Sequence, residues 1–294
     1  MISAFSKCGR RATTIGIAAA AALTLAVGMP AAASAASHVA HPAHSSVVAS
    51  AATSSVKPTI VLVHGAFADA SSFAPVTTRL QHDGYTVVNA PNPLRGLATD
   101  TADVVAFVKA TITGPVVLVG HSYGGSVITG AADDLDQVTG LVYIDAFAPV
   151  DGESANSLSG AQPGSALAVK DTSKVFDFVS YPGATGGDVD AYVQQPYFAK
   201  TFAALLPRAQ ANELAASQSP IAASALNDTF TGTPAWQNIK SYFFIGTADQ
   251  ILPAAEQRIM AKRADGVVVT AKTDHLAMLE APAKVTDLIE KAAR

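Results

Sequence analysis

Six short apolar runs rich in β-branched residues alternate with helix-like stretches, and this alternation constrains the fold more than any other feature. The runs cover residues 59–63, 85–88, 115–119, 141–144, 241–245 and 267–270. Such runs are typical of strands buried on both faces. Strands that alternate with helices are joined by right-handed crossovers into a parallel sheet. The sequence therefore predicts an α/β fold, with a mostly parallel six-stranded sheet and helices on both faces.

The helix-like stretches cover residues 72–81, 99–110, 123–132, 254–262 and 284–293. One gap breaks the alternation, because 96 residues separate the run that ends at residue 144 from the run that begins at residue 241. A connection of that length is expected to carry structure of its own. We interpret residues 149–237 as a mostly helical cap insertion, with its main helices over 188–210 and 212–227.

The start of the chain differs from the rest. Lys7, Arg10 and Arg11 precede an apolar stretch over residues 15–27, and a run of small residues follows. This is the layout of a secretory signal peptide, which predicts removal of residues 1–36 and a secreted or periplasmic protein. The 13 residues of the apolar stretch are too few to cross a bilayer, which needs about 20, so stable membrane insertion after cleavage is not expected. The arginine pair leaves the choice between general secretion and twin-arginine export open.

Residues 37–57 contain mainly Ala, Ser, Val and Thr and have no strand or helix pattern, which predicts a flexible linker before a folded domain over 58–294. Three histidines in this segment, His38, His41 and His44, leave a loose metal-binding arm as the alternative. Cys8, in the predicted signal peptide, is the chain's only cysteine. A thiol nucleophile or a cysteine-rich metal site is therefore excluded from the mature protein.

The charge pattern argues against a nucleic-acid partner. The chain has 19 Lys and Arg against 23 Asp and Glu, and no basic block stands out. Binding to a phosphate backbone needs a concentrated basic face. We expect a small-molecule partner, while the oligomeric state stays undetermined.

A G-x-S-x-G pattern over residues 120–124 follows one predicted strand and precedes a predicted helix. In this context the serine lies in a tight strand-to-helix turn that leaves no room for side chains at the flanking glycines. Ser122 is therefore the predicted nucleophile, and the alternative is a glycine-rich turn with an inactive serine.

A serine hydroxyl needs a base to remove its proton, and this base is most often histidine. Three of the seven histidines lie in the linker, His64 and His121 belong to turns at strand ends, and His82 lies in the first predicted helix. His275 remains, just after the last strand, at the sheet edge where ligands bind in open α/β folds. We predict that His275 is the general base.

The base needs a carboxylate that fixes its tautomer. Asp249 follows the penultimate strand and gives the chain order Ser122, Asp249, His275 that this kind of fold favours. Asp145, at the end of the strand that follows the G-x-S-x-G turn, is the alternative. Asp274 is adjacent to His275 in sequence, which makes the required side-chain hydrogen bond awkward.

Two N–H donors are needed where negative charge develops on the substrate oxygen. One is predicted from the backbone of Tyr123, directly after the nucleophile. The other is predicted from Ala66, in the turn after the first strand. The alternative for the His64-Gly65 pair is a simple strand-ending turn.

The motifs VLVHGA at 61–66, GHSYGG at 120–125 and DH at 274–275 resemble the α/β-hydrolase superfamily. The resemblance covers residues 59–293 and is closest to small bacterial carboxylesterases of the branch that also contains hydroxynitrile lyases. It implies a serine hydrolase that forms an acyl-enzyme with small to medium apolar carboxylic esters and requires no metal or organic cofactor. The predicted signal peptide adds that this hydrolase is secreted. Aromatic and leucine side chains of the cap could line the apolar pocket: Tyr192, Tyr197, Phe198, Phe202, Leu205 and Leu206.

Three other functions occur within the same resemblance and are alternatives to ester hydrolysis. The lyases of this branch, as the resemblance implies, have a lysine after the catalytic histidine and a threonine in the oxyanion turn. Here Leu276 and Gly65 stand at those positions, which disfavours lyase activity. A non-catalytic binding protein is disfavoured because all three triad residue types are present. Perhydrolysis uses the same triad and stays open.

Overall fold

The computed structural model describes residues 56–294. The predicted signal peptide over 1–36 lies outside the described residues, as does the predicted linker over 37–57 except for its last two residues. Within the described residues, no helix has the length and apolar character that crossing a membrane requires.

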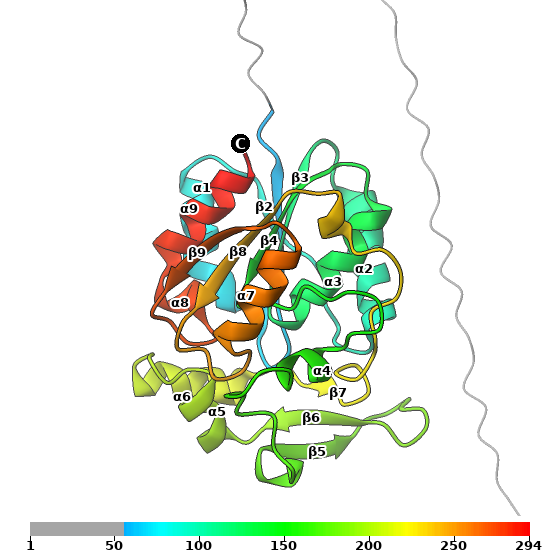
Figure 1. The fold of residues 1–294 in the computed structure, drawn as a ribbon, viewed down its shortest axis with the longest axis vertical. Coiled ribbons are helices and arrows are strands. Elements are labelled where there is room, and N and C mark those ends of the chain that lie inside the picture. The colour runs from blue at the N-terminus through cyan, green and yellow to red at the C-terminus, as the bar shows by residue number, and fades with distance from the viewer. Residues whose placement is uncertain (1–55) are drawn as a thin grey trace, which may run out of the picture. The chain divides into compact units, whose positions relative to one another are not determined.

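A six-stranded parallel sheet forms the centre of the domain (Figure 1). Its strands are β1 (Thr59–Val63), β2 (Val87–Asn89), β3 (Val116–His121), β4 (Val138–Ile144), β8 (Ser241–Gly246) and β9 (Val267–Ala271). They lie in the order β2-β1-β3-β4-β8-β9, and every neighbouring pair is parallel. The predicted α/β class and six-stranded sheet are therefore confirmed.

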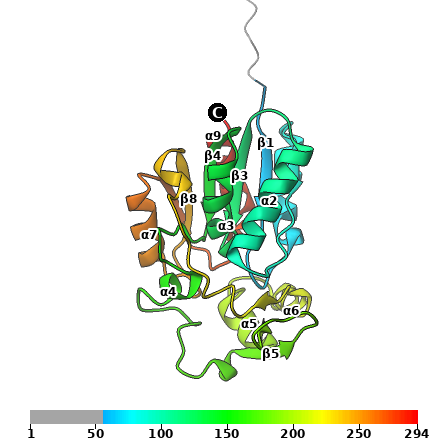
Figure 2. The same ribbon diagram turned by 90° about the vertical axis from the view of Figure 1, so that its right-hand side faces the viewer.

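Helices cover both faces of the sheet. They are α1 (Ala74–His82), α2 (Leu97–Thr111), α3 (Tyr123–Ala131), α7 (Ala254–Arg263), α8 (Ala277–Glu280) and α9 (Pro282–Ala292). Helices α1 and α9 pack against each other on one face, and α2, α3 and α7 lie on the other (Figures 1 and 2). The parallel strands are buried because both of their faces are covered, which explains the continuous apolar runs of the sequence.

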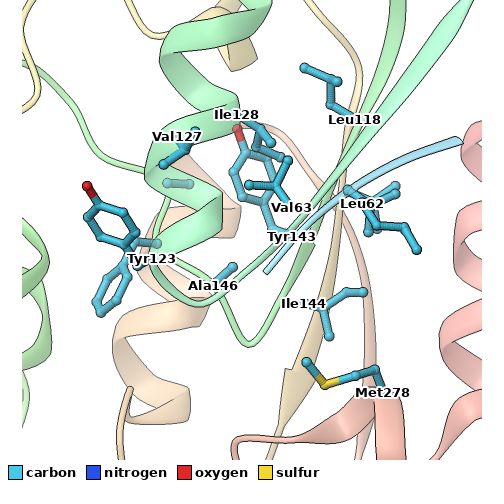
Figure 3. Packing of buried hydrophobic residues seen from close by; sticks show 14 of the residues in the cluster. Leu62, Val63, Leu118, Tyr123, Val127, Ile128, Tyr143, Ile144, Ala146 and Met278 are labelled. Atoms are coloured by element: carbon cyan, nitrogen blue, oxygen red, sulfur yellow. The ribbon is translucent and has the colours of Figure 1, made fainter. Parts of the chain in front are cut away.

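The core contains side chains from opposite faces of the same strands (Figure 3). On β4, Tyr143 lies toward α3, where its hydroxyl is 3.0 Å from Oγ1 of Thr129. The next residue, Ile144, lies on the other side, toward Met278 of α8. This alternation is the strand period of two, and both faces are apolar because both are covered. The sheet is thus a fixed base from which the loops at its carboxyl edge project.

The cap over 149–237 lies beyond the carboxyl ends of the strands (Figure 1). Its helices are α4 (Ala155–Ser159), α5 (Gln195–Thr201) and α6 (Arg208–Ser217). It also holds an antiparallel sheet of β5 (Phe176–Ser180), β6 (Val189–Val193) and β7 (Ile221–Ala222). The prediction of a mostly helical cap is therefore wrong in part.

The predicted helix over 188–210 is in fact strand β6, helix α5 and the first residues of α6. The predicted helix over 212–227 ends at residue 217 and is followed by β7. The physical reason lies in the turn after β5, where Gly183, Gly186 and Gly187 all have positive φ and reverse the chain. This turn pairs β5 with β6, and strand pairing overrides the weak local preference for helix.

Candidate active site

Ser122 lies in a strained turn between β3 and α3. Its backbone has φ 51° and ψ −124°, a conformation that is costly for a residue with a side chain. A Cβ at Gly124 would lie 2.3 Å from the Val63 carbonyl oxygen, and one at Gly120 would lie 2.6 Å from the Gly124 oxygen. The turn therefore requires the glycines at these positions, as the sequence pattern predicts. Serine in this turn is presented at the carboxyl edge of the sheet.

His275 lies in the loop after β9, at the same carboxyl edge of the sheet as Ser122. Its Nε2 is 2.9 Å from the Ser122 hydroxyl oxygen, and its Nδ1 is 2.9 Å from Oδ2 of Asp249. With Nδ1–H donating to the carboxylate, Nε2 is left to accept the serine proton. The structure thus brings Ser122, His275 and Asp249, which lie far apart in the sequence, into one hydrogen-bonded chain.

Burial influences the charge states of these hydrogen-bonded side chains. It lowers the pKa of the His275 imidazole, which favours the uncharged form that can accept a proton. Burial also raises the pKa of the Asp249 carboxyl, while hydrogen bonds from the Ile251 and Leu252 N–H groups and the Gln257 amide oppose that rise. These three donors orient the carboxylate toward the histidine.

The two other candidate acids have different partners. Asp145 accepts hydrogen bonds from the N–H groups of Gly246, at 2.6 Å, and Ala277, at 3.3 Å. It therefore links the end of β8 to the start of α8 and makes no hydrogen bond with the His275 imidazole. Asp274 accepts from the N–H of Leu276 at 3.2 Å and from that of Leu205, in the cap, at 3.0 Å. This link between the cap and the histidine loop carries no local sequence signal.

His121 is a site residue that sequence reasoning assigned only to a turn. Its Nε2 donates a 2.8 Å hydrogen bond to the backbone oxygen of His275, and the two rings lie 4.9 Å apart. Burial holds the pKa of His121 well below its usual value, so its ring is neutral. The sequence signal that could have identified His121 is its position next to Ser122, because the end of β3 faces the loop that carries His275.

The predicted oxyanion donors face the same region. Tyr123 is the first residue of α3, where backbone N–H groups have no partner within the helix. The N–H of the neighbouring Phe67 donates to the Ser219 oxygen in the cap at 3.0 Å, whereas no acceptor for the Ala66 N–H exists among residues 56–294. The amide of Asn92 holds the turn by donating to the His64 oxygen at 2.7 Å. The Tyr123 ring is held by its hydroxyl, which donates to Asp100 at 2.8 Å.

A cavity of about 20 Å³ lies beside Ser122 and also has Ala66 and Tyr123 in its wall. Of the six apolar side chains predicted to line the pocket, Phe202 is the one in the wall of this cavity as the described residues form it. Its ring packs edge-on against His275 with 5.5 Å between ring centres. Phe198 instead stacks under Phe202, and Leu205 is 49% exposed. Phe198, Tyr197 and Leu206 therefore pack within the protein and do not line this cavity.

Within residues 56–294, no group of three or more His, Cys, Asp and Glu side chains could hold a metal ion. The histidines over 38–44 lie outside the described residues, so the metal-binding alternative for that segment stays a prediction.

The order of the strands, the strained turn at Ser122 and the loop that carries His275 are together typical of an α/β-hydrolase. A comparison with protein families agrees with this. Residues 60–288 match the alpha/beta hydrolase family, and the chain belongs to this family. Among solved structures, polyneuridine aldehyde esterase is similar at a TM-score of 0.68 with 17% identity, covering 81% of this chain and 100% of that chain. An extracellular alpha/beta-hydrolase from a Paenibacillus species has a TM-score of 0.65 with 24% identity, covering 81% of this chain and 99% of that chain. At these identities the likeness concerns the fold.

A closer sequence relative covers a shorter stretch. The chain is 36% identical over 110 residues to a carbendazim hydrolyzing esterase from Nocardioides sp. (strain SG-4G), which is 33% of this chain and 46% of that protein. The chain spans about half the length of the curated relatives it matches.

Proposed function

We propose that this protein is a secreted carboxylesterase that cleaves carboxylic esters of small to medium apolar substrates through a serine acyl-enzyme. The observation that carries the proposal is the pair of 2.9 Å contacts that His275 makes with Ser122 and Asp249. In a family of hydrolases, a strained serine beside a neutral imidazole that is oriented by a carboxylate fits acyl transfer. The esterase named among the relatives supports the same reaction class.

In the proposed reaction, Ser122 Oγ attacks the ester carbonyl while His275 Nε2 takes its proton. The backbone N–H groups of Ala66 and Tyr123 would stabilise the negative oxygen that forms. His275 then gives the proton to the leaving alcohol, which departs and leaves an acyl group on Ser122. Water, activated by the same imidazole, releases the acid and restores the serine. Asp249 keeps the imidazole in the required tautomer and stabilises its positive charge.

Ester turnover by a Ser122→Ala variant tests the proposal. We expect kcat to fall by at least about 10³-fold, because the residual rate after loss of the nucleophile comes from binding and the oxyanion site alone. Ser126→Ala, on helix α3, is the matched control and should keep its rate. A fluorophosphonate should label wild type and Ser126→Ala but not Ser122→Ala. Unchanged ester turnover in a folded Ser122→Ala protein would refute the proposed nucleophile.

The other activities are outcomes of the same measurements. A protein that binds ligand but resists fluorophosphonate would be a non-catalytic binder. Rate gain with peroxide and a short carboxylic acid would indicate perhydrolysis. Hydroxynitrile cleavage is not favoured, because a Cβ at Gly65 would lie 2.6 Å from the Ser122 Cβ and leaves no room for the lyase threonine.

Secretion is part of the proposal and has its own test. Expression of the full chain should give extracellular or periplasmic esterase that begins near residue 37. A chain without residues 1–36 should keep its activity inside the cell. Recovery of the full chain, uncleaved, from the cytoplasm alone would contradict export.

A further inference from the structure

A second cavity lies in the cap, next to the one at the nucleophile. It measures about 320 Å³, against about 20 Å³ beside Ser122. Asn156 and Ser159 of helix α4 and the side chains of Leu167 and Leu226 are in the walls of both cavities. These four residues, which we call the neck, are the lining residues that the two cavities share. Figure 1 shows α4 between the central sheet and the β5–β6 hairpin.

The two cavities differ in what they can hold. A space of about 20 Å³ is close to the room that one water needs. A space of about 320 Å³ lies at the lower end of the range for cavities that bind small organic ligands. An ester held at Ser122 therefore has room for a small group near the serine, and a larger group fits only beyond the neck.

The lining of the cap cavity selects the chemistry of that larger group. Its wall includes Phe176 and Phe178 of β5, Ala191 of β6 and Val169, and none of its lining residues is charged. Its amide groups are partly paired, since the Asn156 side chain donates to that of Asn227 at 2.8 Å. The cavity is partly open, since Phe178 in its wall is 45% exposed, so a bulky group can enter it from solvent. Its mostly apolar, uncharged wall offers an apolar group a contact surface and offers a charged group no ion partner.

The two walls are also in contact. Phe67 lies in the wall at Ser122, and its ring centre is 5.7 Å from that of Phe176 in the cap cavity. Leu167 and Leu226, at the neck, are only partly buried, so their side chains have space to change rotamer. The two cavities are therefore neighbours with a shared wall, and a change of rotamer at the two leucines is what would join them.

We propose that the cap cavity is a subsite for the larger, uncharged apolar group of an ester whose carbonyl lies at Ser122, with only a small group on the other side of the ester bond. This inference rests on the proposed esterase function. It names the preferred substrates as asymmetric esters, such as those that join an aromatic ring system to an acetyl or a methyl group. Leu167 and Leu226 then determine which groups can pass the neck.

Ala223→Trp tests the subsite, because Ala223 lies in the wall of the cap cavity and is outside the lining at Ser122. Ala223→Leu is a smaller version that guards against misfolding. The matched control is Ala216→Trp, on the exposed side of α6 in the same cap. Circular dichroism establishes that each variant is folded.

Three substrates are compared by pH-stat titration: ethyl acetate, 2-naphthyl acetate and methyl 2-naphthoate. We expect Ala223→Trp to lower kcat/KM by about tenfold or more for at least one naphthyl ester, with a smaller loss for Ala223→Leu. Ethyl acetate should change less than about threefold, and Ala216→Trp should match wild type throughout. The naphthyl ester that responds shows whether the alcohol or the acyl group enters the cap.

Equal loss on all three esters, or no loss on either naphthyl ester, would overturn the subsite. If wild type cleaves ethyl acetate and takes the fluorophosphonate but rejects both naphthyl esters, the subsite fails and the esterase function stands. If wild type cleaves no ester and is not labelled, the esterase function fails and the subsite fails with it.

Discussion

Asp249→Asn is the sharpest test of how the site is oriented. In the wild type, Oδ1 accepts from the N–H groups of Ile251, at 2.8 Å, and Leu252, at 3.0 Å. Oδ2 accepts from the Gln257 amide and from His275, each at 2.9 Å. An asparagine can keep its oxygen at the first pair, which places its NH₂ group against two donors at the second.

The histidine can avoid this clash by moving its proton from Nδ1 to Nε2. Nε2–H then faces the Ser122 hydroxyl and can no longer take its proton. We expect kcat to fall by about 10³–10⁴-fold, which corresponds to about 4–5.5 kcal/mol of lost transition-state stabilisation. KM should change little, because Asp249 is outside the lining of the cavity at Ser122.

Asp145→Asn is the matched control, since Asp145 was the other candidate acid. Its positive φ of 44° suits asparagine, and an amide oxygen can still accept from Gly246. We expect a stability loss of about 1–3 kcal/mol in urea unfolding and a kcat within tenfold of wild type. The assay is steady-state hydrolysis of p-nitrophenyl acetate at pH 7.5. More than a tenth of wild-type kcat in Asp249→Asn, or an equal loss in a folded Asp145→Asn, would refute this reasoning.

Two further predictions follow from the packing around Ser122. Gly65→Ala should lower kcat by about 10²-fold or more, because its Cβ would lie 2.6 Å from Ser122 Cβ and 2.8 Å from the His121 oxygen. Hydrolysis of p-nitrophenyl acetate measures this loss. An unchanged kcat would contradict the inferred crowding at Gly65. Below about pH 6.5, the advantage in unfolding free energy of wild type over His121→Gln should shrink by up to about 1.4 kcal/mol per pH unit. The sign follows because the unfolded chain protonates His121 while the folded one, with its lowered pKa, does not. Urea unfolding between pH 5 and 8 measures it, and a constant difference rules it out.

The parts of the site that sequence reasoning found depend on local patterns. Ser122 needs two flanking glycines and a strained turn, and all of these lie within five residues of one another. His275 could be reached by elimination, because the chain has few histidines after its first strand. Asp249 could be preferred to Asp145 only by its place in the chain order, since both follow parallel strands at the same sheet edge. The three-dimensional positions of their oxygens distinguish them directly, because Asp249 is the one hydrogen-bonded to His275.

The cap was harder to predict for a physical reason. Strand β5 pairs along its whole length with β6, from Phe176 opposite Val193 to Ser180 opposite Val189. Most of β5 is exposed, so its burial pattern does not differ from that of a surface segment. The signal that could have found the hairpin is the glycine-rich turn over 182–187, which marks a chain reversal. The central strands, buried on both faces, carry the opposite kind of signal and were predicted correctly.

The hydrogen bond from the Leu205 N–H to Asp274 couples the position of the cap to that of the loop that carries His275. The acceptor is the neighbour of the base, and Phe202, three residues before the donor, lies against the imidazole. A movement of this part of the cap would therefore strain the loop that holds His275. We expect that a change which loosens the cap here slows the proposed reaction.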